Sequence, residues 1–293
     1  MNQETLVSQP VIEARGLAKR YGKTVALDSV SFRAEAGRIV GLIGPNGAGK
    51  TTALNAILGL VPAAGAVSVL GFDPYRQRDQ LMEQVCFIAD VAVLPRWIRV
   101  QQAVDFVAHI HPRFRAERCE ELLRQFGLPR KALVSSLSKG MVTQLHLSLV
   151  MAIDARLLVL DEPTLGLDIV SRKQFYDHLL NDYMDEQRTI LVTTHQVEEI
   201  ENILTDLLFI DRGRIVLDMA MDQLPEHYVQ LLTSPDKADA ARALRPLGER
   251  SLLGRSVFIF EDADQQALAA LGELRQPSIA DLFVAKMQPR TST

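Results

Sequence analysis

A short apolar strand followed at once by a glycine-rich loop most strongly limits what this chain can fold into. The run Ile39–Ile43 contains only Ile, Val, Gly and Leu, which is typical of a strand buried on both faces. The next residues, Gly44–Thr51, read GPNGAGKT, and an uncharged segment from about Thr51 to Leu60 predicts a buried helix. A buried strand that leads through a tight loop into a helix is the basic unit of a parallel sheet covered by helices.

Two further apolar runs end in polar residues. Leu157–Leu160 is followed directly by Asp161 and Glu162, and Thr189–Thr194 is followed by His195. Strands of this kind between helical segments predict an α/β fold with a largely parallel sheet covered on both sides. Because ligands of such folds bind at the carboxyl ends of the strands, we expect these polar residues to meet the glycine-rich loop.

The chain divides into two predicted domains, at about residues 11–224 and 225–293. In the first, residues from about Pro95 to Leu128 are predicted to be helical, with one apolar face formed by Val100, Val104, Val107 and Ala108. After about Leu224, short strands at Val229–Leu232 and Val257–Phe260 each precede a helical stretch. This pattern predicts a small α+β appendage.

Composition excludes several classes of protein. The net charge of −4 argues against broad nucleic-acid binding, which needs a positive surface to displace counterions. The two cysteines are too few for a disulfide scaffold or a cysteine zinc site, and they fit a reducing cytoplasm. The uncharged window Thr51–Phe72 is long enough to span a bilayer, but Pro62 and Gly65 interrupt it, which favours a helix, a turn and a short strand at Val67–Leu70. No export signal is expected at the N-terminus.

The glycine-rich loop has the pattern of a phosphate-binding loop, G-x-x-x-x-G-K-[ST], placed between a strand and a helix. Its glycines let backbone N–H groups approach phosphate oxygens, and the start of the helix favours an anion. Lys50 can reach the β- and γ-phosphates, and Thr51 can offer a hydroxyl to Mg²⁺. The alternative is a glycine-rich turn with an incidental lysine. The predicted nucleotide-binding residues here are Gly44, Pro45, Asn46, Gly47, Ala48, Gly49, Lys50, Thr51 and Thr52.

Polar residues at the ends of the two later strands supply the predicted chemistry. Asp161 can hold Mg²⁺ opposite the phosphate loop, and Glu162 can polarise the attacking water as a general base. Taken alone, the pair also fits a solvated turn before Pro163. His195 can contact the γ-phosphate or its water, although it also fits the start of a surface helix. His109 and His111 are interpreted as structural.

Together these residues resemble the ATP-binding cassette (ABC) family, the nucleotide-binding subunits of ABC transporters, over roughly Val11 to Leu224. Tyr21 matches the aromatic residue that stacks on adenine, and Gly166–Asp168 matches the loop that crosses to the partner subunit. Leu137–Met141 lies where the family has its Leu-Ser-Gly-Gly-Gln signature, although read alone it fits an ordinary helix N-cap. The nucleotide contacts that the resemblance adds are Tyr21, Ser138, Gly140 and Asp168.

The resemblance implies an α/β P-loop NTPase core with an antiparallel N-terminal β subdomain and a helical signature subdomain at about residues 91–150. It further implies ATP and Mg²⁺ as ligands, with Lys50, Glu162 and His195 as catalytic residues. Two cassettes, either two copies of this chain or this chain with a different cassette, would close face to face, and a separate multi-span membrane permease would form the transport path. No nucleic acid is expected as a partner.

Two departures from the family pattern bear on activity. Lys139 and Met141 replace the glycine and glutamine of the signature, while Ser138 and Gly140 remain. Asp90 stands where the family usually has a glutamine that helps to hold Mg²⁺ and the attacking water. A carboxylate still offers oxygen ligands but adds negative charge near the phosphates. We therefore expect Asp90 to be a metal ligand, together with Thr51 and Asp161, that alters catalytic tuning without abolishing hydrolysis.

The C-terminal segment bears on the subfamily. Pro277–Phe283, PSIADLF, is similar to the closing helix motif of bacterial ABC-2-type exporter cassettes, which implies export. The wider resemblance to transporter ATP-binding subunits implies a cytoplasmic location on the inner face of the cell membrane. The helical stretch Pro95–Leu128 is the expected docking surface, with Trp97 either a contact or a packed core residue. Two alternatives remain open: a soluble ABC ATPase that does not act in transport, and a weakly hydrolysing regulatory cassette.

Overall fold

The computed structural model describes residues 9–88, 94–165 and 167–287, apart from the side chain of Asp182. The main sheet has parallel neighbours throughout except for its last pair, β8 and β9, so the predicted α/β fold with a largely parallel sheet is confirmed. In spatial order its six strands are β5 (Val85–Ile88), β6 (Leu157–Asp161), β7 (Thr189–Thr194), β3 (Ile39–Ile43), β8 (Asp206–Asp211) and β9 (Arg214–Ala220).

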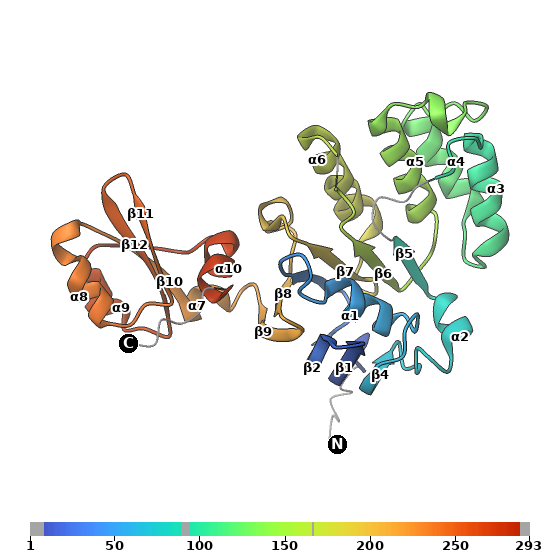
Figure 1. Cartoon of the computed structure of the whole chain (residues 1–293). Helices are drawn as coiled ribbons and strands as arrows, with labels where there is room; N and C mark the ends of the chain where they lie inside the picture. The colour runs from blue at the N-terminus through green and yellow to red at the C-terminus, as the bar shows by residue number, and fades with distance from the viewer. Residues whose placement is uncertain (1–8, 89–93, 166, 288–293) are drawn as a thin grey trace, which may run out of the picture.

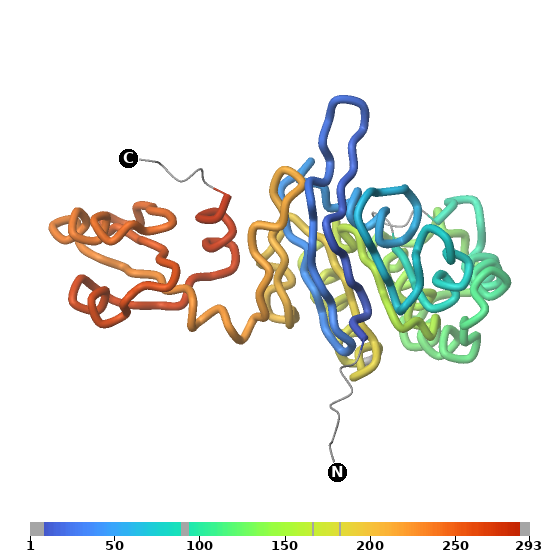
Figure 2. The backbone as a smooth tube through the Cα atoms, turned by 90° about the horizontal axis from the view of Figure 1, so that it is seen from below, coloured from blue at the N-terminus to red at the C-terminus, as the bar shows by residue number. Residues whose placement is uncertain are grey.

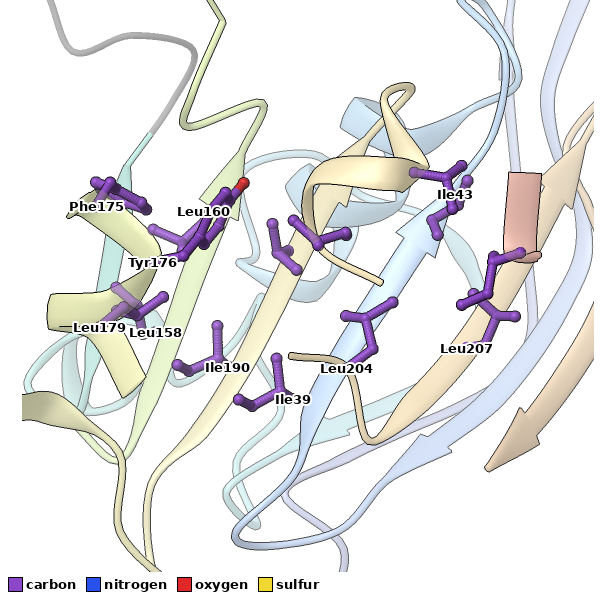
Figure 3. Packing of buried hydrophobic residues seen from close by; sticks show 14 of the residues in the cluster. Ile39, Ile43, Leu158, Leu160, Phe175, Tyr176, Leu179, Ile190, Leu204 and Leu207 are labelled. Carbon is purple, nitrogen blue, oxygen red and sulfur yellow. The ribbon is translucent and has the colours of Figure 1, made fainter. Parts of the chain in front are cut away.

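Alternate residues of each central strand face two separate cores, because successive side chains of a strand point to opposite faces. Ile39 and Ile43 of β3 pack in one hydrophobic cluster, whereas Val40 and Leu42 pack in the other. The first cluster is completed by α5 (Lys139–Met151) and by α6 (Ile169–His178). Figure 3 shows Phe175 of α6 beside Leu160 of β6. The second is completed by α1 (Lys50–Ile57).

A second, antiparallel sheet stands at the N-terminus, with spatial order β2-β1-β4. Its strands are β1 (Ile12–Tyr21), β2 (Thr24–Ala34) and β4 (Ala64–Val69). The hairpin formed by β1 and β2 projects from the body of the molecule in Figure 2. The uncharged window after the glycine-rich loop forms α1, a turn and β4, as expected.

The helical region consists of α3 (Val100–Ile110), α4 (Ala116–Gln125) and α5. These helices pack around a hydrophobic core that is distinct from the two cores of the main sheet. The stretch from about Pro95 to Leu128 is therefore largely helical, as predicted, but it is divided into two helices. Pro112 explains the break, because proline has no N–H and drives the preceding residue, His111, out of the helical conformation. Ala108 was also misplaced: it is exposed, and Ala103 is buried beside Val104 instead.

The C-terminal residues build a third, antiparallel sheet with spatial order β11-β12-β10-β13, at the left of Figure 1. Its strands are β10 (Tyr228–Thr233), β11 (Gly248–Leu252), β12 (Arg255–Glu261) and β13 (Glu273–Arg275). The helices beside it are α7 (Leu224–His227), α8 (Ala238–Ala243), α9 (Gln265–Ala269) and α10 (Ile279–Met287). The remaining short elements are α2 (Arg78–Met82), η1 (Val134–Ser136), η2 (Leu179–Tyr183), η3 (Val197–Glu199) and η4 (Pro235–Lys237).

Helix α10 joins this C-terminal part to the main sheet. Its residues Ile279 and Leu282 belong to the same hydrophobic cluster as Leu207 and Phe209 of β8. The rings of Phe209 and Phe283 meet edge to face at 5.1 Å between centroids, a favoured aromatic arrangement. None of the helices in the described residues has both the length and the apolar character needed to cross a membrane.

Candidate active site

The glycine-rich loop takes a backbone conformation that favours glycine at two positions. Gly47 and Gly49 have φ angles of 80° and 112°, in the left-handed region. A Cβ atom at Gly49 would lie 2.5 Å from the carbonyl oxygen of Ala26, whereas one at Gly47 would meet nothing within 4 Å. Gly49 precedes α1 without capping it through a side chain, so the first N–H groups of that helix remain available to an anion.

Lys50, the first residue of α1, places its ammonium group between the loop and the end of β6. Its Nζ donates a hydrogen bond of 2.6 Å to the carbonyl oxygen of Gly44 and lies 3.5 Å from Oε1 of Glu162. The side chain is only 7% exposed. A cation held in this way at the start of a helix strengthens the attraction of the loop for phosphate.

Asp161, the last residue of β6, faces Thr51 across the site. Thr51 Oγ1 donates to Asp161 Oδ2 at 3.1 Å, and Thr193 Oγ1 of β7 donates to Asp161 Oδ1 at 2.5 Å. Asp161 is 5% exposed, and Thr193 is fully buried. Both oxygens of this carboxylate are therefore held in place, because a buried charge needs hydrogen-bond partners.

Glu162 connects the ends of β6 and β7. Its φ of 49° lies in the left-handed region, at a cost of about 1 to 2 kcal/mol for a residue with a side chain. The backbone N–H donates to the carbonyl oxygen of Thr193 at 3.1 Å, which helps to hold this conformation. His195 Nδ1–H donates to Glu162 Oε2 at 2.8 Å. The carboxylate thus lies between His195 and Lys50, and its strained backbone is typical of a functional site.

The residues fit a nucleotide with Mg²⁺. A hydroxyl and a carboxylate, from Thr51 and Asp161, are the hard oxygen ligands that Mg²⁺ prefers. Within the described ranges, no group of three or more His, Cys, Asp or Glu side chains could bind a metal by itself. Mg²⁺ ordinarily completes its ligand shell with water and substrate phosphates, and the uncapped start of α1 lies beside these two residues.

Four predicted contacts lie outside this group. Tyr21 is 48% exposed at the end of the β1–β2 hairpin, where it pairs with Thr24, and the ammonium of Lys19 lies 5.2 Å from its ring centroid. Ser138 is exposed and accepts a hydrogen bond from the Met141 N–H, capping α5, with Gly140 in the first turn. Asp168 is also exposed and caps α6.

Hydrogen bonds from the Ser171 N–H and hydroxyl lower the pKa of Asp168 below its usual value. Asp90 and Gly166 fall outside the described residues. The two histidines interpreted as structural have backbone partners: His109 Nδ1 lies 2.6 Å from the Asp105 carbonyl oxygen, and His111 Nε2 lies 3.4 Å from that of Val85.

Sequence reasoning missed Thr193. Its hydroxyl donates to Asp161 and lies 3.3 Å from the N–H of Glu162, so it contacts both acids. A signal was present, since Thr193 and Thr194 are polar residues at the end of an otherwise apolar run. The sequence does not specify which acid the Thr193 hydroxyl contacts. That depends on the register of β6 and β7, in which Asp161 pairs with Thr193.

Comparisons with known proteins identify the family of this chain. Residues 27–165 match the family model described as ABC transporter. The Nod factor export ATP-binding protein I of Burkholderia thailandensis is 32% identical over 299 residues, which covers 93% of this chain and 95% of that protein. The daunorubicin/doxorubicin resistance ATP-binding protein DrrA of Streptomyces peucetius is 31% identical over 268 residues, covering 88% and 80%.

A solved structure described as the ATP binding subunit of an ABC transporter has the same fold. It superposes with a TM-score of 0.66 at 26% identity and covers 74% of this chain and 92% of that one. An ATP-binding cassette in its ADP conformation superposes with a TM-score of 0.64 at 19% identity, over 75% of this chain and 96% of that one. The chain therefore belongs to the ATP-binding subunits of ABC transporters, and it is an ATPase.

Proposed function

We propose that this chain powers export through a separate multi-span membrane permease by binding and hydrolysing ATP with Mg²⁺. The observation that carries the proposal is the convergence of Lys50, Thr51, Asp161, Glu162 and His195 at the carboxyl ends of β3, β6 and β7. Export is supported by relatives whose names describe Nod factor export and daunorubicin resistance.

Each residue of the group has a distinct role in the proposed reaction. The phosphate loop and Lys50 hold the β- and γ-phosphates, and Glu162 accepts the proton of the attacking water. His195 orients the Glu162 carboxylate and reaches toward the γ-phosphate. Mg²⁺, held by Thr51 and Asp161, with Asp90 as a further ligand expected from the sequence, would neutralise charge on the phosphate oxygens.

Two copies of the cassette would enclose the nucleotides between them. Ser138 and Asp168 are exposed and lie at the starts of α5 and α6. We infer that Ser138, Gly140 and Asp168 reach the nucleotide bound to the other cassette, while Tyr21 stacks on adenine. Lys139 is also exposed and would add a positive charge at this surface.

The helical region is the proposed docking surface for the permease. Trp97 is 77% exposed, so its interpretation as a packed core residue is wrong, and Phe106 and Ile110 of α3 are 66% and 64% exposed. Contiguous apolar surface marks interaction sites, and Phe106 and Ile110, four residues apart on α3, are neighbours on one face of that helix. We infer a location on the cytoplasmic face of the membrane, with residues 11–224 as the cassette and residues 225–293 as a small α+β appendage.

The first experiment compares Mg-ATP turnover of the wild type with Glu162→Gln. We expect kcat to fall by about 100-fold or more, because a general base is lost, while ATP binding persists. The control is Glu198→Gln, an exposed glutamate on η3, which should keep wild-type turnover. Undiminished turnover of Glu162→Gln would exclude the proposed base.

The second experiment concerns the partners. Affinity purification from detergent-solubilised native membranes should recover a multi-span membrane protein in stoichiometric amount. ATP should also convert Glu162→Gln from monomer to dimer in light scattering, because a cassette that cannot hydrolyse ATP stays closed. Recovery only from the soluble fraction, without a membrane protein, would favour a soluble ABC ATPase instead.

A further inference from the structure

Arg172 of α6 bridges two loops that flank the active site. Its Nε donates to the carbonyl oxygen of Leu167 at 2.8 Å, in the loop that leads away from Glu162. Its Nη1 donates to Oε1 of Gln196 at 2.9 Å and to Oε1 of Glu199, both in the turn that follows His195. One guanidinium therefore links the segment that follows Glu162 to the segment that follows His195.

Glu199 extends the same bridge. Its second oxygen, Oε2, accepts a hydrogen bond of 2.9 Å from the hydroxyl of Thr164, two residues after Glu162. Thr164 is 4% exposed, and its hydroxyl also lies 3.3 Å from the hydroxyl of buried Tyr176. Both carboxylate oxygens of Glu199 are thus paired in a partly buried environment, where such hydrogen bonds are stronger than in water.

The turn after His195 is also anchored to the hydrophobic core and to α10. Val197 and Ile200 are buried in the cluster that contains α10. Oε1 of Glu201 accepts a hydrogen bond of 3.2 Å from the N–H of Ile279, at the start of that helix. This packing restricts movement of the turn. The Arg172–Glu199 pair then fixes the position of the turn relative to the loop that begins at Glu162.

We propose that Arg172 and Glu199 are positioning residues for ATP hydrolysis that keep His195 within hydrogen-bond reach of Glu162. The proposal rests on the roles in hydrolysis proposed above for Glu162 and His195. Neither positioning residue bonds directly to Lys50, Glu162 or His195 in the described structure, so each acts through the backbone of a loop. A displacement of about 1 Å in such a site can lower a rate by about 100-fold.

The geometry requires arginine at position 172. Three acceptors, Leu167 O, Gln196 Oε1 and Glu199 Oε1, surround one planar guanidinium. A lysine ammonium keeps the charge but lacks the rigid fork of donors that meets all three at once. Arg172→Lys should therefore lose most of the effect although the net charge is unchanged.

The test measures steady-state ATPase kinetics for Arg172→Lys and Glu199→Gln, alone and combined with His195→Ala. We expect each single variant to lower kcat by about 10- to 100-fold with little change in KM or ATP binding. Added to His195→Ala, either change should have no further effect, because the residue that it positions is gone. The neighbouring exposed residues supply controls, Lys173→Gln and Glu198→Gln, which should keep wild-type kinetics.

The outcomes separate this proposal from the one it rests on. Unchanged kcat in His195→Ala alone would remove the proposed role of His195. A fall in kcat for His195→Ala together with unchanged kcat in both positioning variants would overturn the present inference. The inference would also be overturned if the fold reductions in kcat of the single variants multiplied in the double variants with His195→Ala. Such a result would indicate a general structural loss that does not act through His195. Thermal unfolding of each variant verifies that the protein is folded during the assay.

Discussion

At the residue scale, the two acids at the end of β6 are held at every carboxylate oxygen. Asp161 is held by Thr51 and Thr193, and Glu162 by Lys50 and His195. The partners come from α1, from β7 and from the residue after β7. Because each bond fixes one oxygen, the acids cannot rotate away without leaving a partly buried polar group unpaired.

Replacing Thr193 with valine tests this arrangement. Thr193→Val keeps the shape but removes the donor to Asp161, so we expect a loss of about 1.5 to 3 kcal/mol in the free energy of unfolding and a fall in kcat of about tenfold or more. The control is Thr189→Val, which is also fully buried on β7 but donates to the carbonyl oxygen of Glu35 at 3.1 Å. Urea unfolding and ATPase assays should show a stability loss for both and a kcat loss for Thr193→Val alone.

His146 of α5 predicts a dependence of stability on pH. Among the described residues its Nε2 is a buried nitrogen without a hydrogen-bond partner, and burial lowers the pKa of His146 from 6.5 to about 4. The unfolded chain therefore binds a proton at a higher pH than the folded one, so stability is complete above pH 6.5 and falls as the pH drops toward 4. At about 1.4 kcal/mol per pH unit, the loss approaches about 3 kcal/mol.

The measurement is urea unfolding between pH 4 and pH 7, over the window set by the two pKa values. His146→Leu should remove this contribution, so the difference in unfolding free energy between variant and wild type should grow as the pH falls. The exposed His109 supplies the control, since His109→Gln should follow the wild-type profile. A constant difference between His146→Leu and wild type across this range would contradict the prediction.

At the scale of elements, the helices near the site begin in two different ways. Asp168 and Ser138 cap α6 and α5 with their side chains, whereas α1 starts after Gly49 with no side-chain cap. A side-chain cap satisfies N–H groups that would otherwise be free. The helix behind the phosphate loop therefore keeps its N–H groups for an anion, and the other two begin on the surface proposed to face a second copy.

The Ser138 cap can be tested against a matched cap elsewhere. Ser138→Ala should lower the free energy of unfolding by about 1 kcal/mol, because the hydrogen bond from the Met141 N–H is lost. Asp264→Ala removes the cap of α9 in the C-terminal part and should cost a similar amount. Only Ser138→Ala should also lower ATP turnover. Equal turnover in both variants would show that Ser138 acts as a cap alone.

At the scale of the whole molecule, α10 connects the C-terminal sheet to the cassette. Ile279 and Leu282 are 2% and 1% exposed, and their cluster includes Phe209 at the centre of β8. In Figure 1 this helix lies between the C-terminal sheet and strand β8. Because the two parts share one hydrophobic cluster, we expect them to unfold in a single cooperative transition.

Truncating Leu282 should weaken both parts together. We expect Leu282→Ala to lower the free energy of unfolding by about 2 to 5 kcal/mol, the usual cost of a cavity in a core. Val284→Ala on the same helix, where the side chain is 55% exposed, should change it by less than about 0.5 kcal/mol. Thermal melting would show one transition for the wild type. Two separate transitions would indicate that the parts unfold independently.

Local pattern by itself predicted the strand, glycine-rich loop and helix around Gly44–Thr51, because apolar runs and glycines act over a few residues. The same reasoning placed Asp161 and His195 at strand ends. It erred where a local signal was overlooked: Pro112 divides the stretch from Pro95 to Leu128 into two helices. The apolar face assigned to α3 also contained Ala108 in place of Ala103.

Contacts between distant segments were decided only by the tertiary structure. The pairing of Asp161 with Thr193 depends on the order and register of neighbouring strands, which arise from packing of the whole sheet. The bridge from Arg172 to Glu199 and the docking of α10 join residues far apart in the chain. Such contacts leave no periodic signal in the sequence, because hydrophobic pattern specifies which face is buried and not which partner covers it.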